Sequence, residues 1–277
     1  MTTIKQMTLL VFFCLWVWCC TDSNKPTEGV ANIESKQKAF TIEAKMDIDT
    51  LLSRFDKEVV HIGYDFEVKK AKIYLGVNSH KIFSSLIREL NIDSSKYDVT
   101  FFCKDGYSPT VSLLQLLERN GYIVTKDVEA KDVWEEDIKA KFAPAYLVWD
   151  IPKNDHKHAF PYGIVQLQFI EKATEYSLAK PRTTAKEPIE GFALFKDKCI
   201  KCHSINQEGG IMGPELNYPK NITEYWQLEQ IKLFIKNPSS FRANTKMPQL
   251  TELTDAQIDL IFKYLQFMTT QKIVKND

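Results

Sequence analysis

Two cysteines and a histidine stand within five consecutive residues of the C-terminal third, as Cys199-Ile200-Lys201-Cys202-His203. This C-x-x-C-H pattern constrains the fold more than any other feature of the chain, because it brings two thiols and an imidazole to one short segment. Apolar residues at helical spacing precede the segment, so we expect it to close a helix. Cysteines three residues apart near a helix end share one face.

Three kinds of chemistry use such a pattern. A redox-active C-x-x-C pair follows a strand and opens a helix, whereas this pair closes one. A zinc site needs two further Cys or His ligands, and neither residue type occurs after His203. Covalent attachment of haem through two thioether bonds needs only the five residues present. We therefore predict one covalent haem c, attached at Cys199 and Cys202, with His203 as an iron ligand.

The rest of the C-terminal third, residues 189–277, has the pattern of helices alone. Apolar spacing predicts helices over 189–201, over 225–236 and from Thr254, where Thr-x-x-Gln forms a capping box. A helical domain of about 90 residues encloses a small apolar core and is only marginally stable by itself. A large, flat, apolar cofactor would complete such a core.

Residues 186–271 resemble a class I cytochrome c domain over its full length. The stretch from Gly191 to Phe195 matches the first helix of that family, and GGIMGPEL at 209–216 matches its loop. Lys246-Met247-Pro248 resembles the segment with the second iron ligand, and residues 253–265 resemble the terminal helix. The resemblance implies an all-α, monohaem domain that transfers electrons.

Three methionines in this domain are candidates for the second iron ligand. Met268 lies on the tail of the last predicted helix, and Met212 is close enough to His203 in sequence to lie on the histidine side of the ring. Met247 lies in a loop held by Pro248 and can reach the opposite face, so we predict Met247, with water or an open position as the rival. A His/Met pair occupies both of the iron's remaining coordination positions, so the iron can only exchange single electrons by outer-sphere transfer. This predicts an electron carrier and not an enzyme.

The segment 39–178 mixes strand and helix patterns, which predicts an α/β (α+β) domain with a mixed sheet. Short runs rich in Val, Ile, Phe and Tyr predict its strands, and apolar spacing predicts helices over 82–90 and 111–117. The strands are expected at 59–62, 72–77, 99–103, 122–124, 145–149 and 164–170. Polar and Pro-containing stretches predict a flexible tether at 21–38 and a domain linker at 179–188.

Parts of this segment resemble the molybdopterin-binding domain of sulfite-oxidase-like enzymes. The resemblance rests on VTFFCKDGYS at 99–108, AYLVW at 145–149 and PYGIV at 161–165. It implies Cys103 as a molybdenum ligand, although a small buried strand residue is the favoured interpretation. The arginines that such sites use are few, so we expect a cofactor-free relative of the fold. The arginines of this chain between residues 40 and 172 are Arg54, Arg88 and Arg119.

One further loop holds metal-binding residue types. Asp155, His156 and His158 lie between Pro152 and Pro161, and two histidines two residues apart can share a metal ion. No third strong ligand is evident in the sequence. We therefore expect a solvated loop here.

The first twenty residues predict export. An almost wholly apolar run at 7–20 is too short for a bilayer-spanning helix of about 20 residues and suits the core of a secretory signal. Its abrupt end resembles a bacterial lipoprotein signal, which implies a lipid on Cys20. An ordinary cleaved signal and an uncleaved anchor are the alternatives. Each of these places the remaining chain outside the cytoplasm, on the periplasmic or cell-surface side.

Composition narrows the partners. Lys plus Arg equals Asp plus Glu, at 36 each, so nothing indicates a nucleic-acid partner. A mean hydropathy of −0.27 excludes a polytopic membrane protein. The sequence therefore predicts a membrane-anchored c-type cytochrome with redox proteins as partners. The alternatives are the cytochrome-containing subunit of a molybdenum-dependent oxidoreductase and a haem-based sensor.

Overall fold

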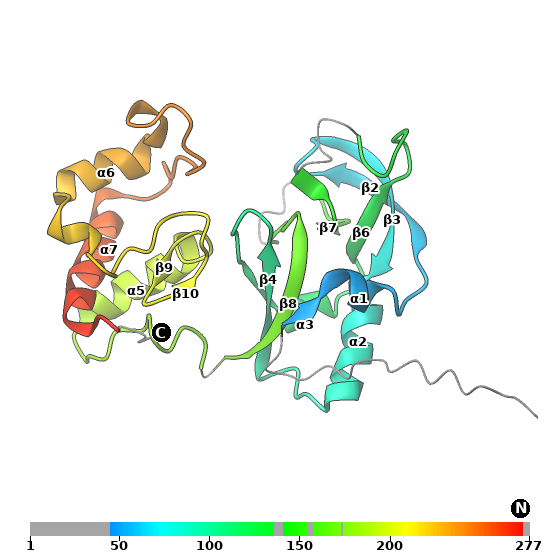
Figure 1. The fold of residues 1–277 in the computed structure, drawn as a ribbon, viewed down its shortest axis with the longest axis horizontal. Coiled ribbons are helices and arrows are strands. Elements are labelled where there is room, and N and C mark those ends of the chain that lie inside the picture. The colour runs from blue at the N-terminus through cyan, green and yellow to red at the C-terminus, as the bar shows by residue number, and fades with distance from the viewer. Residues whose placement is uncertain (1–44, 136–140, 154–157, 173, 274–277) are drawn as a thin grey trace, which may run out of the picture. The chain divides into compact units, whose positions relative to one another are not determined.

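The computed structural model describes residues 45–135, 141–153, 158–172 and 174–273 (Figure 1). Contacts between Cα atoms divide the chain into Met1–Ala39 and Phe40–Asp277, and every contact discussed below lies within the second unit. There we call residues 45–172 the sheet region and residues 174–273 the helical region. The predicted signal, tether and lipid-modified Cys20 lie outside the described residues. None of the helices described is long and apolar enough to cross a membrane.

Two four-stranded sheets build the sheet region, with strand orders β1-β8-β4-β5 and β2-β3-β6-β7. Every pairing between the described strands of these sheets is antiparallel, so the predicted mixed sheet is wrong and the region is α+β. The strands are β1 (Met46–Asp47), β2 (Glu58–Asp65), β3 (Lys70–Asn78), β4 (Tyr97–Cys103), β5 (Thr110–Ser112), β6 (Gly121–Asp127), β7 (Tyr146–Trp149) and β8 (Ile164–Glu171). The helices are α1 (Ile48–Leu52), α2 (Ser79–Leu90) and α3 (Leu113–Leu116).

Side-chain alternation gives this region two apolar clusters. Strand β7 is buried on both faces, because Leu147 and Trp149 enter one cluster while Tyr146 and Val148 enter the other. The first cluster joins both sheets to α1, α2 and α3. The second packs Trp134 against the opposite face of the second sheet. All the apolar faces of β7 are therefore covered by side chains of the sheet region itself.

A group of charges is buried beside the second cluster. The Lys72 ammonium lies 2.6 Å from a carboxylate oxygen of Asp127, and both side chains are fully buried. Glu135 accepts a hydrogen bond from the same ammonium at 2.9 Å. Asp65 is also buried and accepts from the Tyr74 hydroxyl at 2.8 Å. A buried charge is costly without a partner, so these ion pairs and hydrogen bonds stabilise the buried side chains in their positions.

Helices dominate the second region, which also contains one short hairpin. The predicted helical domain is therefore confirmed, with the addition of this hairpin, where the chain turns back directly after His203. The α-helices are α5 (Lys186–Lys198), α6 (Leu228–Lys236) and α7 (Asp255–Met268). The 3-10 turns are η1 (Ile222–Glu224), η2 (Pro238–Ser240) and η3 (Thr269–Gln271), and the hairpin strands are β9 (Ser204–Ile205) and β10 (Glu208–Gly209).

Helices α5 and α7 cross at close range. A Cβ on Gly191 would lie 2.0 Å from the Leu260 carbonyl oxygen, so this crossing requires glycine. The predicted capping box begins α7: Thr254 Oγ1 accepts from the Gln257 amide, and the Gln257 side chain accepts from the Thr254 amide. Phe195 and Tyr264 lie in the single apolar cluster that these helices share with α6.

The predicted strands are confirmed, while one helix prediction is largely wrong. Each of the six strand ranges overlaps an observed strand. The helix expected at 111–117 is a single turn, α3, because Val111 belongs to β5 and pairs with Val99. Pairing to β4 stabilises Val111 in extended form despite its helical spacing. Helix α5 also begins earlier than expected, at Lys186, inside the predicted linker.

Candidate haem-attachment site

The C-x-x-C-H segment forms a tight turn at the end of α5. Cys199 caps the helix, and its amide donates to the Phe195 carbonyl at 2.8 Å. The Cys199 carbonyl accepts from the amides of Cys202 at 3.0 Å and His203 at 2.9 Å. The segment therefore lies at the end of a helix, as predicted. Hydrogen bonds to the Cys199 carbonyl hold both cysteines and the histidine in one turn.

His203 is held on two sides. Its Nδ1 donates to the Pro214 carbonyl at 2.9 Å. Gly213 lies against the ring, because a Cβ there would be 2.4 Å from Cε1 and 2.6 Å from Nδ1. Burial lowers the pKa of His203, while the bond to Pro214 and the nearby Glu215 carboxylate act in the opposite direction. The net lowering favours the neutral imidazole, which is the metal-binding form.

The two cysteines of the motif have different surroundings. Cys199 is half-buried at the edge of the helical region's apolar cluster, and burial raises the pKa of its thiol to about 12. Cys202 lines a cavity of about 1330 Å³ beside the helical region. Burial also raises the pKa of the Cys202 thiol. Neither cysteine forms a disulfide with another described cysteine.

The three methionines lie in distinct places. Met268 is fully buried inside the helical region's cluster, which suits a packing residue. Met212 is half-buried and lines the same cavity as Cys202. Met247 packs against the edge of the apolar cluster, as Cys199 does. Its amide donates to Thr245 Oγ1 at 3.2 Å, and the following loop is tied to α6 by the Leu250 amide, which donates to Ile235.

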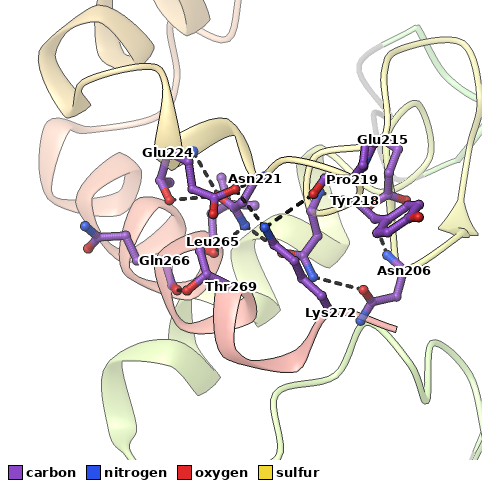
Figure 2. Close-up of polar contacts among 12 residues, drawn as sticks. Asn206, Glu215, Tyr218, Pro219, Asn221, Glu224, Leu265, Gln266, Thr269 and Lys272 are labelled. Carbon is purple, nitrogen blue, oxygen red and sulfur yellow. Dashed lines mark hydrogen bonds and ion pairs between the residues drawn. The ribbon is translucent and has the colours of Figure 1, made fainter. Parts of the chain in front are cut away.

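Buried amides join the segment after His203 to the end of α7. Asn217 donates to Asn206 Oδ1 at 2.9 Å, and Asn221 donates to Asn217 Oδ1 at 2.7 Å. Asn221 also donates to the Leu265 carbonyl at 2.8 Å, and all three asparagines are buried. We call Asn206, Asn217 and Asn221 the asparagine ladder. Figure 2 shows polar contacts at this join, where Lys272 also reaches Pro219 and Glu224.

A single carboxylate organises the loop between the hairpin and the ladder. Glu215 accepts from four backbone amides, those of Asn206, Gln207, Asn217 and Tyr218, at 2.8 to 3.2 Å. Sequence reasoning missed Glu215 and the asparagine ladder. The one available signal was the density of Asn and Glu around the glycine-rich loop, which is also typical of a solvated turn.

The other predicted ligand residues lie elsewhere. Cys103 is buried at the end of β4, and burial raises the pKa of its thiol to about 12, which suits the small strand residue that we favoured. The ring of His158 lies 4.7 Å from that of Trp149. Asp155 and His156 lie outside the described residues. Within the described part of the chain, no three His, Cys, Asp or Glu residues are grouped to hold a metal ion.

The residues present fit a covalent haem. Cys199 and Cys202 lie on one turn with His203, whose engaged Nδ1 leaves Nε2 as the nitrogen for iron. Cys199 and Met247 are both among the partly buried residues that pack against the helical region's apolar cluster. The cavity beside Cys202 also includes Lys246 and Pro248, the neighbours of Met247. Such a group supplies one-electron redox chemistry.

Comparisons with known proteins find relatives of the helical region. The family model "Cytochrome c" matches residues 189–269 and does not extend into the sheet region. A cytochrome c of Theileria annulata is 30% identical over 78 residues, which is 22% of this chain and 68% of that protein. No solved structure matched. The family is one of covalent haem c and electron transfer, and through its helical region the chain belongs to the cytochrome c family.

Proposed function

We propose that the protein carries single electrons through one covalent haem c, attached at Cys199 and Cys202 and ligated by His203 and Met247. The carrying observation is that Cys199, Cys202 and His203 lie on one turn at the end of α5, within the stretch that matches the cytochrome c family. With both axial positions taken by protein side chains, no substrate can reach the iron. The remaining chemistry is transfer of one electron to or from a redox protein.

The first experiment tests attachment. Purified protein should keep its colour through acid-acetone extraction, and its mass should exceed that of the polypeptide by one haem. The paired variant Cys199→Ser and Cys202→Ser should lose both properties, whereas Cys103→Ala should keep them. Colour that is extracted from the wild-type protein contradicts the proposal.

The second experiment tests the iron ligand. The oxidised protein should show the weak sulfur-to-iron absorption band, and Met247→Leu should abolish it. Met212→Leu and Met268→Leu are matched controls that should keep the band. If only Met212→Leu lost the band, the ligand would be Met212, and the proposed role of Met247 would be wrong. Carbon monoxide binding by the reduced wild-type protein would favour a sensor.

We also propose that the protein acts outside the cytoplasm, anchored by lipid at Cys20. The support is the apolar run at 7–20, which ends at cysteine and is followed by a polar stretch. Labelling cells with a radioactive fatty acid should mark the wild-type protein and not Cys20→Ser. Labelling of the Cys20→Ser variant contradicts lipid attachment at this residue.

The sheet region has no proposed redox centre of its own. Cys103 is buried at the end of β4, and within the described residues it lies in no group of three His, Cys, Asp or Glu residues that could hold a metal ion. Metal analysis of the purified protein should therefore find iron near one atom per chain. Molybdenum in a similar amount would instead support the oxidoreductase-subunit alternative.

A further inference from the structure

The turn between β4 and β5, residues 103–109, contacts the haem-attachment segment through its backbone. The Ser108 amide donates to the Lys201 carbonyl at 2.8 Å, inside the C-x-x-C-H motif. The Ile211 amide donates back to the Gly106 carbonyl at 2.9 Å. Donors therefore run in both directions, which fixes the register of the two segments.

Gly106 makes this contact possible. Its φ of +89° lies in the left-handed region, which other residues rarely adopt. A Cβ there would lie 2.7 Å from the Met212 amide nitrogen and 2.8 Å from the Ile211 carbonyl carbon. These neighbours are backbone atoms and cannot rotate away, so the turn is close-packed on the loop after His203.

Two side chains extend the contact. Tyr107 is half-buried and lines the same cavity as Cys202. Thr110 lies at the start of β5, and its Oγ1 is within hydrogen-bond distance, 3.1 Å, of the Tyr176 hydroxyl oxygen. Tyr176 belongs to the apolar cluster of the helical region. The contact therefore reaches from the motif to that cluster.

We propose that the 103–109 turn is a built-in wall of the haem site, which covers the Cys202 side and excludes large redox partners from it. This inference rests on the proposed function for the haem and adds a role for the sheet region. A small redox reagent passes such a wall more easily than a protein does. Electron exchange with proteins must then use another side of the site.

The experiment compares Gly106→Ala with Gly63→Ala. The added methyl group at Gly106 meets backbone at 2.7 Å, whereas at Gly63 it meets only a side-chain oxygen of Asp150 at 3.7 Å. Hydrogen exchange on the intact holoprotein should show protected amides at Ser108 and Ile211, and Gly106→Ala should expose both. Gly63→Ala should leave them protected.

The same samples are then oxidised by ferricyanide, a small reagent, and by a soluble blue-copper protein, a large one. The ratio of the large-reagent rate to the small-reagent rate should rise several-fold in Gly106→Ala and stay unchanged in Gly63→Ala. A second variant, Tyr107→Ala, keeps the backbone contacts and opens the cavity, so it should raise the ratio without exposing the amides. This variant keeps the test decisive if Gly106→Ala folds poorly.

Two results overturn the inference. Rapid exchange at Ser108 and Ile211 in the wild-type protein would show that the turn does not dock. An unchanged rate ratio in variants with an opened turn or cavity would show that it covers no route to the haem. A wild-type protein without covalent haem instead defeats the proposed function, and the exchange data still report the docking.

Discussion

The two regions bury polar groups of different kinds. The sheet region buries charges, Lys72 against Asp127, beside apolar clusters that its own side chains complete. The helical region buries the neutral amides of the asparagine ladder, and Cys199 and Met247 are among the partly buried residues that pack against its apolar cluster. The cytochrome c family match covers the helical region alone, so we expect the folding of that region, and not of the sheet region, to depend on a further apolar group.

The largest effect should come from removing the attachment. The paired variant Cys199→Ser and Cys202→Ser should lose most protection from hydrogen exchange in α6 and in the 237–250 loop, because the small helical core loses its apolar partner. Strands β4 and β8 should stay protected. Exchange measured by mass spectrometry separates the regions, and an equal loss in both would break the comparison.

Removing the buried ammonium should destabilise the sheet region strongly. Lys72→Met leaves Asp127 buried without its cation, and breaking such a pair costs about 3–5 kcal/mol of unfolding free energy. Urea unfolding followed by tryptophan fluorescence measures this loss. Lys70→Met is the matched control, because its exposed pair with Glu135 is worth about 0–1 kcal/mol. Equal losses would show that burial does not distinguish the two lysines.

Breaking the asparagine ladder should have a smaller effect in the helical region. Asn217→Leu removes one donor and one acceptor, which costs about 1–3 kcal/mol when the partners stay buried. The measurement is urea unfolding followed by haem absorbance. Gln249→Leu, which loses one exposed bond to Asn237, should stay within about 0.5 kcal/mol of the wild type. A loss above that for Lys72→Met would reverse the comparison.

The smallest effect concerns a helix end. Thr254→Ala removes the capping box of α7 and should cost about 1 kcal/mol of unfolding free energy. The exposed Thr251 provides the control, since Thr251→Ala should change the stability by less than about 0.5 kcal/mol. Identical melting curves for the two variants would show that the cap contributes nothing to α7.

Local patterns in the sequence predicted local structure well. The C-x-x-C-H spacing and the Thr254 capping box depend on residues within a few positions of each other, and the structure has both features. Val111 shows where such reasoning fails, because its strand is stabilised by Val99 on another element. The sequence also did not predict whether the strands pair parallel or antiparallel, because the composition of a strand does not specify its neighbouring strand or the direction of that neighbour.

The partners of the site were the hardest to predict. Asn206 and Leu265 are joined through the asparagine ladder, although they are far apart in the chain. The contact between Gly106 and Ile211 likewise joins two regions that the sequence divides at a predicted linker. Such contacts arise from tertiary packing, which leaves no periodic pattern in either segment.

Gly213 has a consequence for the speed of redox chemistry. Gly213 lies so close to the His203 ring that a Cβ there would be 2.4 Å from Cε1, and the bond from Nδ1 to the Pro214 carbonyl holds the imidazole from a second side. If His203 ligates iron as proposed, a ring held in this way would present the same nitrogen to oxidised and reduced iron. Little nuclear rearrangement would then accompany the arrival or departure of an electron, and a site preorganised in this way would exchange electrons quickly.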